Sequence, residues 1–174
     1  MTTILFVCLG NICRSPLAEA AFRFEAERAG LAVTVDSAGT GDWHVGEPPD
    51  PRAIAVARAH GLDISGYRGR QVAAEDFEAF DHMVALDHAN LSRLRALRPE
   101  GARAELSLLL DHVPGRAGEP VADPYYGGPE GFETTWADVT SGARVRAEPF
   151  FAVEEPRAIS LLFRNRTVCS DIAA

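Results

Sequence analysis

Residues 7–16 read Val-Cys-Leu-Gly-Asn-Ile-Cys-Arg-Ser-Pro and follow directly on an apolar run. The apolar run predicts a buried strand, and Ser15 followed by Pro16 is typical of a helix N-cap and a first helical position. Gly10 and Asn11 suit the short loop between strand and helix because both tolerate a positive φ. The segment therefore predicts a strand, a tight loop and a helix within a few residues.

This loop predicts an anion site with a thiol in it. Its inward-turned backbone N–H groups and the positive end of the helix dipole stabilise a phosphoryl dianion or the thiolate of Cys8. Arg14 follows six residues later, and its planar guanidinium can hold two phosphate oxygens at once. The candidate phosphate-binding residues are Leu9, Gly10, Asn11, Ile12, Cys13, Arg14 and Ser15. These residue types at this spacing indicate phosphate-ester chemistry with Cys8 as the nucleophile.

The spacing of Cys8 and Arg14 is not specific by itself. With 3 cysteines and 17 arginines in 174 residues, it is expected by chance about 0.3 times. The alternative is an inert core cysteine. The strand before, the helix after and the Gly-Asn pair inside favour a functional loop over that alternative.

Strand and helix patterns alternate along the rest of the chain, which is typical of a parallel sheet covered on both faces. The expected strands are residues 3–7, 31–36, 82–86 and 104–110. The expected helices are residues 16–29, 51–60, 73–80 and 88–97, with a last helix from about residue 132. Asp50 and Asp87 are expected N-caps. The predicted fold is α/β: a single-domain, four-stranded parallel sheet with helices on both faces and the phosphate-binding loop after the first strand.

The composition narrows the class of protein. The hydrophobic fraction of 47% without a long apolar run predicts a soluble globular domain with no membrane association, and no secretory signal is evident. Three cysteines do not make a disulfide framework, which favours the cytoplasm. A net charge of −8 argues against nucleic-acid binding. The chain has no Lys, so all 17 of its Lys and Arg residues are Arg, which hints at a GC-rich bacterial genome.

Four further segments accompany the loop: Asp36-Ser37-Ala38-Gly39-Thr40, Asp42-Trp43-His44-Val45-Gly46, Asp50-Pro51-Arg52 and Asp123-Pro124-Tyr125-Tyr126-Gly127. Together with residues 7–16, and in this order, they resemble the low molecular weight protein tyrosine phosphatases over residues 1 to about 142. We therefore expect a phosphatase domain over residues 1–148.

The resemblance implies hydrolysis of phosphotyrosine and small aryl phosphates through a phosphocysteine on Cys8. Arg14 would bind the phosphate, and Asp123 would act as general acid and then general base. From the residues alone, an Asp before Pro is also a common turn former. No cofactor or metal is expected, since the five histidines lack metal-ligand spacing. The expected partners are tyrosine-phosphorylated proteins, bound by a monomer.

The resemblance also assigns a substrate slot. The loop residues Trp43, Tyr125 and Tyr126 would wall a deep slot that accepts an aryl ring, although loop aromatics can equally be scaffold. His44 is expected at the rim, where a lone histidine is also often incidental. Phosphoserine and phosphothreonine would be too short to bring phosphorus to Cys8.

Two further expectations concern the surroundings of the loop. Cys13 is the expected redox partner that traps oxidised Cys8 as a disulfide, unless it is a small apolar filler. Asn11, Ser37 and residues 65–71 are expected to support the loop from behind. Relatives often carry a histidine within residues 65–71; here the Tyr67 hydroxyl takes over its hydrogen bond, or the network is weaker.

The carboxyl end departs from the family's pattern. A helical stripe begins at Trp136 but is interrupted by Pro149, and no helical period follows. Residues 149–174 are therefore expected to form an atypical extension that is poorly ordered and dispensable for chemistry. A natural extension and a shifted reading frame both remain open as its origin.

Three other functions are weighed against tyrosine phosphatase. A thioredoxin-coupled arsenate reductase needs two further cysteines, and none lies between Cys13 and Cys169. An arginine phosphatase of the same family would be expected to carry Thr in place of Ile12. A non-catalytic phosphotyrosine-binding module would have lost Cys8 or Asp123.

Overall fold

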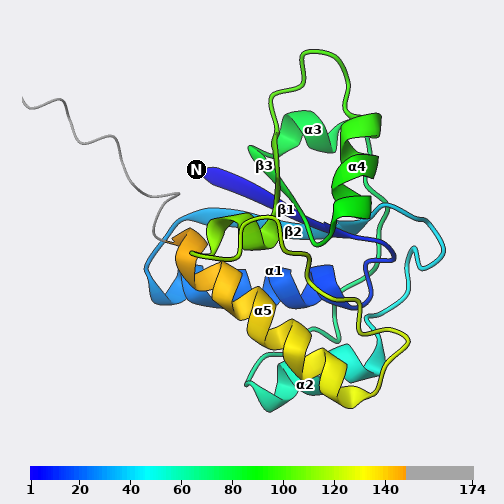
Figure 1. The fold of residues 1–174 in the computed structure, drawn as a ribbon, viewed down its shortest axis with the longest axis vertical. Helices are drawn as coiled ribbons and strands as arrows, with labels where there is room; N and C mark the ends of the chain where they lie inside the picture. Colours follow the sequence, from blue (N-terminus) through cyan, green and yellow to red (C-terminus); the bar gives the residue numbers. More distant parts are fainter. Residues whose placement is uncertain (148–174) are drawn as a thin grey trace, which may run out of the picture.

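The structure is a computed structural model and describes residues 1–147. Its centre is one parallel sheet in the order β2-β1-β3-β4 (Figure 1). The strands are β1 (Thr2–Cys8), β2 (Val33–Gly39), β3 (His82–Ala85) and β4 (Glu105–Leu108). The predicted four-stranded α/β fold is confirmed. The expectation for residues 149–174 falls outside the described residues.

Helices cover both faces of this sheet (Figure 1). One face carries α1 (Arg14–Arg28), α2 (Pro51–Ala59) and α5 (Pro129–Ala147). The other face carries α3 (Asp76–Ala79) and α4 (His88–Leu97). A short 3₁₀ helix, η1 (Leu109–His112), follows the last strand. Helix α1 packs against both α5 and the sheet, so the segment after the loop is held on two sides.

Strand β1 is the centre of the core. Ile4 and Phe6 belong to the cluster under α1, α2 and α5, whereas Leu5 and Val7 belong to the cluster under α3 and α4. All four side chains are fully buried, as expected for an apolar run covered on both faces. Because β1 is fixed on both sides, the position where it ends, at Cys8, is fixed as well.

The structure corrects the predicted start of α1. The helix begins at Arg14 with Cys13 at the N-cap, and no side chain caps it. Ser15 lies inside the helix, so its interpretation as the N-cap was wrong. The physical reason is that its hydroxyl contacts the Cys8 Sγ, 3.1 Å away, and so serves the loop instead of the helix end.

Two other boundaries also differ from the prediction. Helix α5 begins at Pro129, three residues earlier than expected, in keeping with proline at the first position of a helix. The last strand ends at Leu108 because the chain turns into η1 there. The predicted caps are confirmed: Asp50 accepts from the Arg52 N–H at 2.8 Å and Asp87 from the Asn90 N–H at 2.7 Å. Within residues 1–147, no helix has both the length and the apolarity to cross a membrane.

Candidate active site

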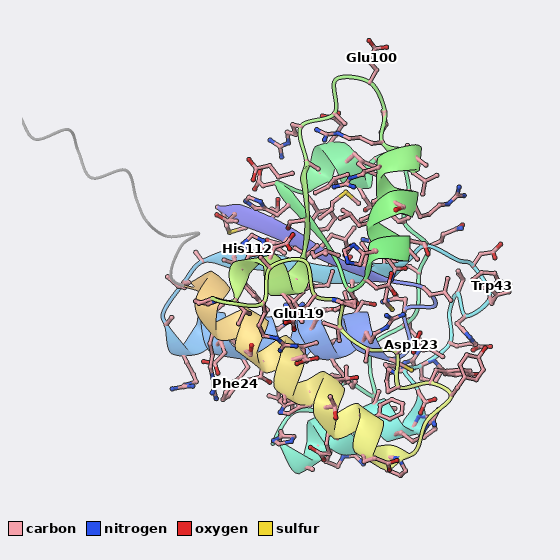
Figure 2. The ribbon with its side chains drawn as sticks, viewed as in Figure 1. Phe24, Trp43, Glu100, His112, Glu119 and Asp123 are labelled. Atoms are coloured by element: carbon pink, nitrogen blue, oxygen red, sulfur yellow. The ribbon has the colours of Figure 1, made fainter. Side chains whose placement is uncertain are left out.

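A pocket of about 320 Å³ opens where β1 ends and α1 begins. Figure 2 shows Trp43 and Asp123, which both line it, on the same side of the molecule. Its lining consists of Cys8, Leu9, Gly10, Ile12, Cys13, Arg14, Trp43, His44, Asp123, Tyr125 and Tyr126. The pocket thus brings together every predicted site residue except Asn11 and Ser15, which contact the loop from behind.

The contacts of Ser15 decide which way its hydroxyl proton points. The Asn11 Nδ2 can only donate, and it does so to the Ser15 Oγ at 2.9 Å. The single Ser15 proton is then left for the Cys8 Sγ at 3.1 Å or the Ala38 carbonyl at 3.4 Å. The closer sulfur is favoured, so Ser15 is placed to donate a hydrogen bond to a Cys8 thiolate.

Asn11 holds the loop in shape. Its φ of 58° lies in the left-handed region that was predicted for it. The side-chain amide donates to Ser15 and, at 3.0 Å, to the Ser37 Oγ, while its Oδ1 accepts from the backbone N–H of Arg70 at 2.9 Å. The predicted support by Asn11, Ser37 and residues 65–71 is confirmed in its placement.

The link from residues 65–71 to Asn11 is thus the backbone of Arg70, and Tyr67 does not provide it. The Tyr67 hydroxyl interacts with Arg23, and burial raises the pKa of Tyr67. Arg23 in turn donates to Glu19 at 2.7 Å. Tyr67 therefore supports the loop at one remove, through Arg23 and Glu19.

Glu19 closes the network behind the loop. Ser37 accepts from Asn11 and donates its own proton to the Glu19 Oε2 at 2.8 Å. The Glu19 residue is buried, and this burial raises the pKa of its carboxyl group, with the hydrogen bonds from Ser37 and Arg23 opposing the shift. A continuous chain of hydrogen bonds therefore runs from a buried carboxyl group to the Cys8 sulfur.

Arg14 is buried and held by acceptors from two other loops. Its Nη1 atom donates to the Asp87 Oδ2 at 2.6 Å and to the Val121 carbonyl at 3.2 Å. Its Nη2 atom donates to the Asp123 Oδ2 at 2.7 Å. These contacts use three of the five guanidinium donors among the described residues. Two donors remain, the number that a bidentate contact with phosphate oxygens requires.

Asp87 is a site residue that the sequence reasoning missed. Its predicted role as the N-cap of α4 is correct, but one carboxyl oxygen also orients Arg14. The missing signal was the strand order: β3 pairs with β1, so the residue after β3 lies beside the loop after β1.

Asp123 is exposed and lies over the pocket on the loop before α5. Its Oδ1 accepts from the Tyr125 N–H at 3.1 Å, a local turn contact, and its Oδ2 contacts Arg14. The two interpretations of this residue, turn former and site residue, therefore both describe its contacts.

Arg52, also not predicted as a site residue, fastens the Asp123 loop. Its guanidinium donates to the carbonyls of Tyr125 and Gly127, both at 3.1 Å, and stacks 4.7 Å from the centre of the Phe132 ring. Asp50 binds the same guanidinium at 2.9 Å, while the Asp50 N–H donates to the Ile12 carbonyl at 2.8 Å. The start of α2 thereby joins the phosphate loop to the Asp123 loop.

Cys13 lines the pocket beside Cys8. Both residues are buried and both are free thiols. Burial, followed by the negative charge of Asp50, raises the pKa of the Cys13 thiol. Cys13 is thus held in the protonated form next to the candidate nucleophile.

The rim of the pocket is aromatic and open, whereas its base is closed. Tyr126 is 95% and Trp43 68% exposed, against 3% for Cys8. Tyr125 and Tyr126 meet edge to face, with ring centroids 5.1 Å apart. These rings line the pocket instead of packing in the core.

His44 lies against the phosphate loop. Gly10 does not adopt the positive φ that the sequence suggested for it. Glycine is needed there for space, because a Cβ atom would lie 3.0 Å from the His44 ring. The His44 Nδ1 is 2.6 Å from the Glu47 carboxylate. Within the described part of the chain, no three His, Cys, Asp or Glu side chains are grouped so as to hold a metal ion.

A cysteine and an arginine lie together between a parallel strand and a helix, with a carboxyl group above them, which is the arrangement that the sequence predicts for phosphate-ester chemistry. Residues 3–148 match the family described as low molecular weight phosphotyrosine protein phosphatase. The chain belongs to this family and is a phosphatase of the hydrolase class.

Individual relatives agree with this assignment. The low molecular weight protein-tyrosine-phosphatase of Streptomyces coelicolor is 50% identical over 135 residues, which are 75% of this chain and 82% of that protein. The crystal structure of YfkJ from Bacillus subtilis has a TM-score of 0.78 at 38% identity and covers 84% of this chain and 92% of its own. A Drosophila arginine phosphatase has a TM-score of 0.82 at 31% identity, covering 88% of this chain and 100% of its own.

Proposed function

We propose that this protein hydrolyses phosphotyrosine in proteins, and small aryl phosphates, through a phosphocysteine on Cys8. The observation that carries the proposal is a nearly inaccessible Cys8 at the base of a pocket whose rim is formed by exposed aromatic rings. A flat aryl group can lie between such rings while its phosphate reaches the loop. A shorter phosphoserine side chain would leave its phosphorus above the sulfur.

In the first step, the Cys8 thiolate attacks phosphorus while the bond to the phenolic oxygen breaks. Ser15 donates a hydrogen bond to the thiolate, and Arg14 holds two phosphate oxygens with the donors that Asp87, Val121 and Asp123 leave over. The Asp123 carboxyl group gives its proton to the departing phenolic oxygen. The products of this step are tyrosine and phosphocysteine.

In the second step, the Asp123 carboxylate takes a proton from water, whose oxygen attacks phosphorus. The phosphorus–sulfur bond breaks, releasing orthophosphate and the Cys8 thiolate. Neither step calls on a metal or a cofactor, because Arg14 and the loop carry the phosphate charge. The proposal therefore includes metal-independent turnover.

The proposal must also specify which phosphorylated residue is the substrate, because a relative of similar structure is an arginine phosphatase. Ile12 lines the pocket with a hydrocarbon side chain, in place of the threonine that the resemblance led us to expect of an arginine phosphatase. Together with the aromatic rim, an apolar wall favours an aryl group over a charged guanidinium. Phosphotyrosine is the preferred substrate on this ground.

The test is turnover of matched peptides that differ only in the phosphorylated residue, in buffer with a chelator. Phosphotyrosine should be hydrolysed, phosphoserine should not, and Cys8→Ala should be inactive on all peptides. Faster hydrolysis of phosphoarginine than of phosphotyrosine, or loss of turnover with the chelator, would contradict the proposal.

We also propose that Cys13 protects the nucleophile from oxidation. Peroxide converts the Cys8 thiolate to a sulfenic acid, and the Cys13 thiol condenses with it to a disulfide and water. Because burial raises the pKa of Cys13, little thiolate is available for this step near neutral pH, and trapping should quicken as the pH rises. After peroxide and then dithiothreitol, wild type should recover more activity than Cys13→Ser. Equal recovery would leave Cys13 as an apolar filler.

The setting that we propose is the bacterial cytoplasm, with the protein acting as a monomer that does not bind nucleic acid. Free thiols at Cys8 and Cys13 suit a reducing compartment, and the net charge of −8 opposes binding to a polyanion. Light scattering of the purified protein tests the monomer, and a concentration-dependent dimer mass would contradict it.

A further inference from the structure

A second cavity, of about 390 Å³, adjoins the active-site pocket. The two share Leu9 and Trp43, so these two side chains form a partition between them. The reaction described above uses none of the other residues that line this cavity. Among them are Asn90 and Arg93, contributed by α4.

One side chain of the partition, Trp43, packs against the backbone although it is mostly exposed. The Trp43 ring lies directly over Gly41, where any Cβ atom would overlap the indole. Such a close approach is possible only at glycine. A ligand that reaches past Trp43 therefore has the active-site pocket on one side and the second cavity on the other.

An unpartnered amide closes the inner wall of the cavity. Asn90 is only 2% exposed, and its Nδ2 atom has no hydrogen-bond partner among the described residues. Its Oδ1 accepts a long 3.4 Å bond from the Thr40 hydroxyl, and its backbone N–H is bound by Asp87. A buried donor without an acceptor is costly, and Asn90 lines the cavity, so an acceptor bound there would relieve this cost.

The outer wall carries a free positive charge. Arg93 is exposed and makes no ion pair with a described residue, in a chain whose net charge is −8. Gln71 adds a second amide to the lining, and its Nε2 makes a 3.3 Å bond to the Thr40 carbonyl. Asp42 is the acidic residue of the lining, and its negative charge counteracts the attraction of Arg93 for an anion.

We propose that this cavity is a subsite for an acidic side chain that flanks the phosphotyrosine of the substrate protein. The inference rests on the proposed function and defines its substrate class. The carboxylate would pair with Arg93 and accept from Asn90, the donor that lacks a partner. An extended peptide advances about 3.3 Å per residue, so it crosses a partition one side chain thick within two or three residues.

The test uses phosphotyrosine peptides with one Glu placed in turn at each of the three positions on either side, against an all-Ala parent. In wild type, Glu at one or two of these positions should raise kcat/KM about two- to five-fold, as expected for a partly exposed ion pair, and high salt should reduce the gain. The readout is the Glu-to-Ala ratio within each variant, so general changes in turnover cancel.

Three variants separate the subsite from bulk charge. Arg93→Gln should bring the ratio close to one, and Asp42→Asn should increase it. Arg95→Gln removes an exposed charge from the same helix, outside the cavity, and should leave the ratio as in wild type.

Two outcomes would overturn the subsite: a wild-type ratio of one at every position, or equal loss of the ratio in Arg93→Gln and Arg95→Gln. Turnover of p-nitrophenyl phosphate, which has no flanking residues, separates this failure from that of the proposed function. A wild type inactive on both p-nitrophenyl phosphate and the parent peptide would overturn the two together.

Discussion

The hydroxyl of Ser15 shows how single atoms decide the chemistry of this loop. Because Asn11 donates to the Ser15 hydroxyl, the one proton of Ser15 is left for the Cys8 sulfur at 3.1 Å or the more distant Ala38 carbonyl at 3.4 Å. Asn11 is itself fixed by Ser37 and by the backbone of Arg70. Hydrogen bonds from three separate segments of the chain therefore position the group that contacts the sulfur.

Asp123 gives the first prediction at the scale of the residue. Asp123→Asn keeps an oxygen for the Tyr125 N–H but cannot give up a proton. We expect kcat on a phosphotyrosine peptide to fall about 10²- to 10⁴-fold, the usual contribution of a general acid. The loss on p-nitrophenyl phosphate should be much smaller because its leaving group needs no proton. Equal losses on both substrates would identify Asp123 as a scaffold residue.

The second prediction at this scale concerns Glu19, whose carboxyl pKa is raised by burial. Below the ordinary value of 4.5, the carboxyl group is protonated in both folded and unfolded protein, so burial imposes no charge penalty. As the pH rises from there through the higher folded pKa, the unfolded state releases its proton first, and stability is lost. Above the folded pKa, the loss is complete.

Glu19→Gln has no such proton. Its free energy of unfolding should rise relative to that of wild type over this pH window and then level off, as measured by urea denaturation at a series of pH values. Glu27→Gln, on the exposed side of the same helix, is the matched control. A difference between Glu19→Gln and wild type that is constant with pH, or that shrinks as the pH rises, would refute the assignment.

At the scale of elements, the start of α2 coordinates two loops that are far apart in sequence. Asp50 caps the helix, contacts the phosphate loop through Ile12 and holds Arg52, which in turn binds the Asp123 loop. The residues at this helix cap thereby connect the phosphate loop to the Asp123 loop.

Arg52→Leu should therefore act on the acid step. We expect kcat for a phosphotyrosine peptide to fall about ten-fold with KM little changed, because a loosened loop misplaces Asp123, and Arg52→Lys should recover part of the loss. The loss on p-nitrophenyl phosphate should be smaller. Arg58→Leu, which removes an exposed cation of the same helix, is the control. Equal losses on both substrates would show a general structural defect.

Most elements were predictable because their signals are local. The buried run at β1, the proline after Asp50 and the capping residue Asp87 each act on their own neighbours in sequence. The missed site features depend on distant partners. Arg52 reaches the Asp123 loop and Asp87 reaches Arg14 only once the strand order and the packing of α2 are known.

The prediction for the N-terminus of α1 was wrong for a related reason. Ser15 and Pro16 form a good local capping pattern, but the hydroxyl serves Cys8 instead. The contact with Cys8 therefore uses the hydroxyl that the local pattern assigned to the helix cap.

At the scale of the molecule, both hydrophobic cores and the candidate active-site pocket described above are formed by residues within 1–147. A chain truncated after Glu148 is therefore expected to fold and to keep the kcat/KM of the full-length chain on p-nitrophenyl phosphate. Circular dichroism and steady-state kinetics of the two chains check this. Loss of both folding and activity on truncation would contradict it.

Mass spectrometry of the quenched enzyme tests whether Cys8 carries the phosphoryl group. In Asp123→Asn with p-nitrophenyl phosphate, the first step needs no acid but the second lacks its base, so the intermediate should accumulate. We expect one phosphoryl group, mapped to Cys8 and absent from Cys8→Ala/Asp123→Asn. A phosphoryl group on another residue, or turnover without any phosphoenzyme, would contradict it.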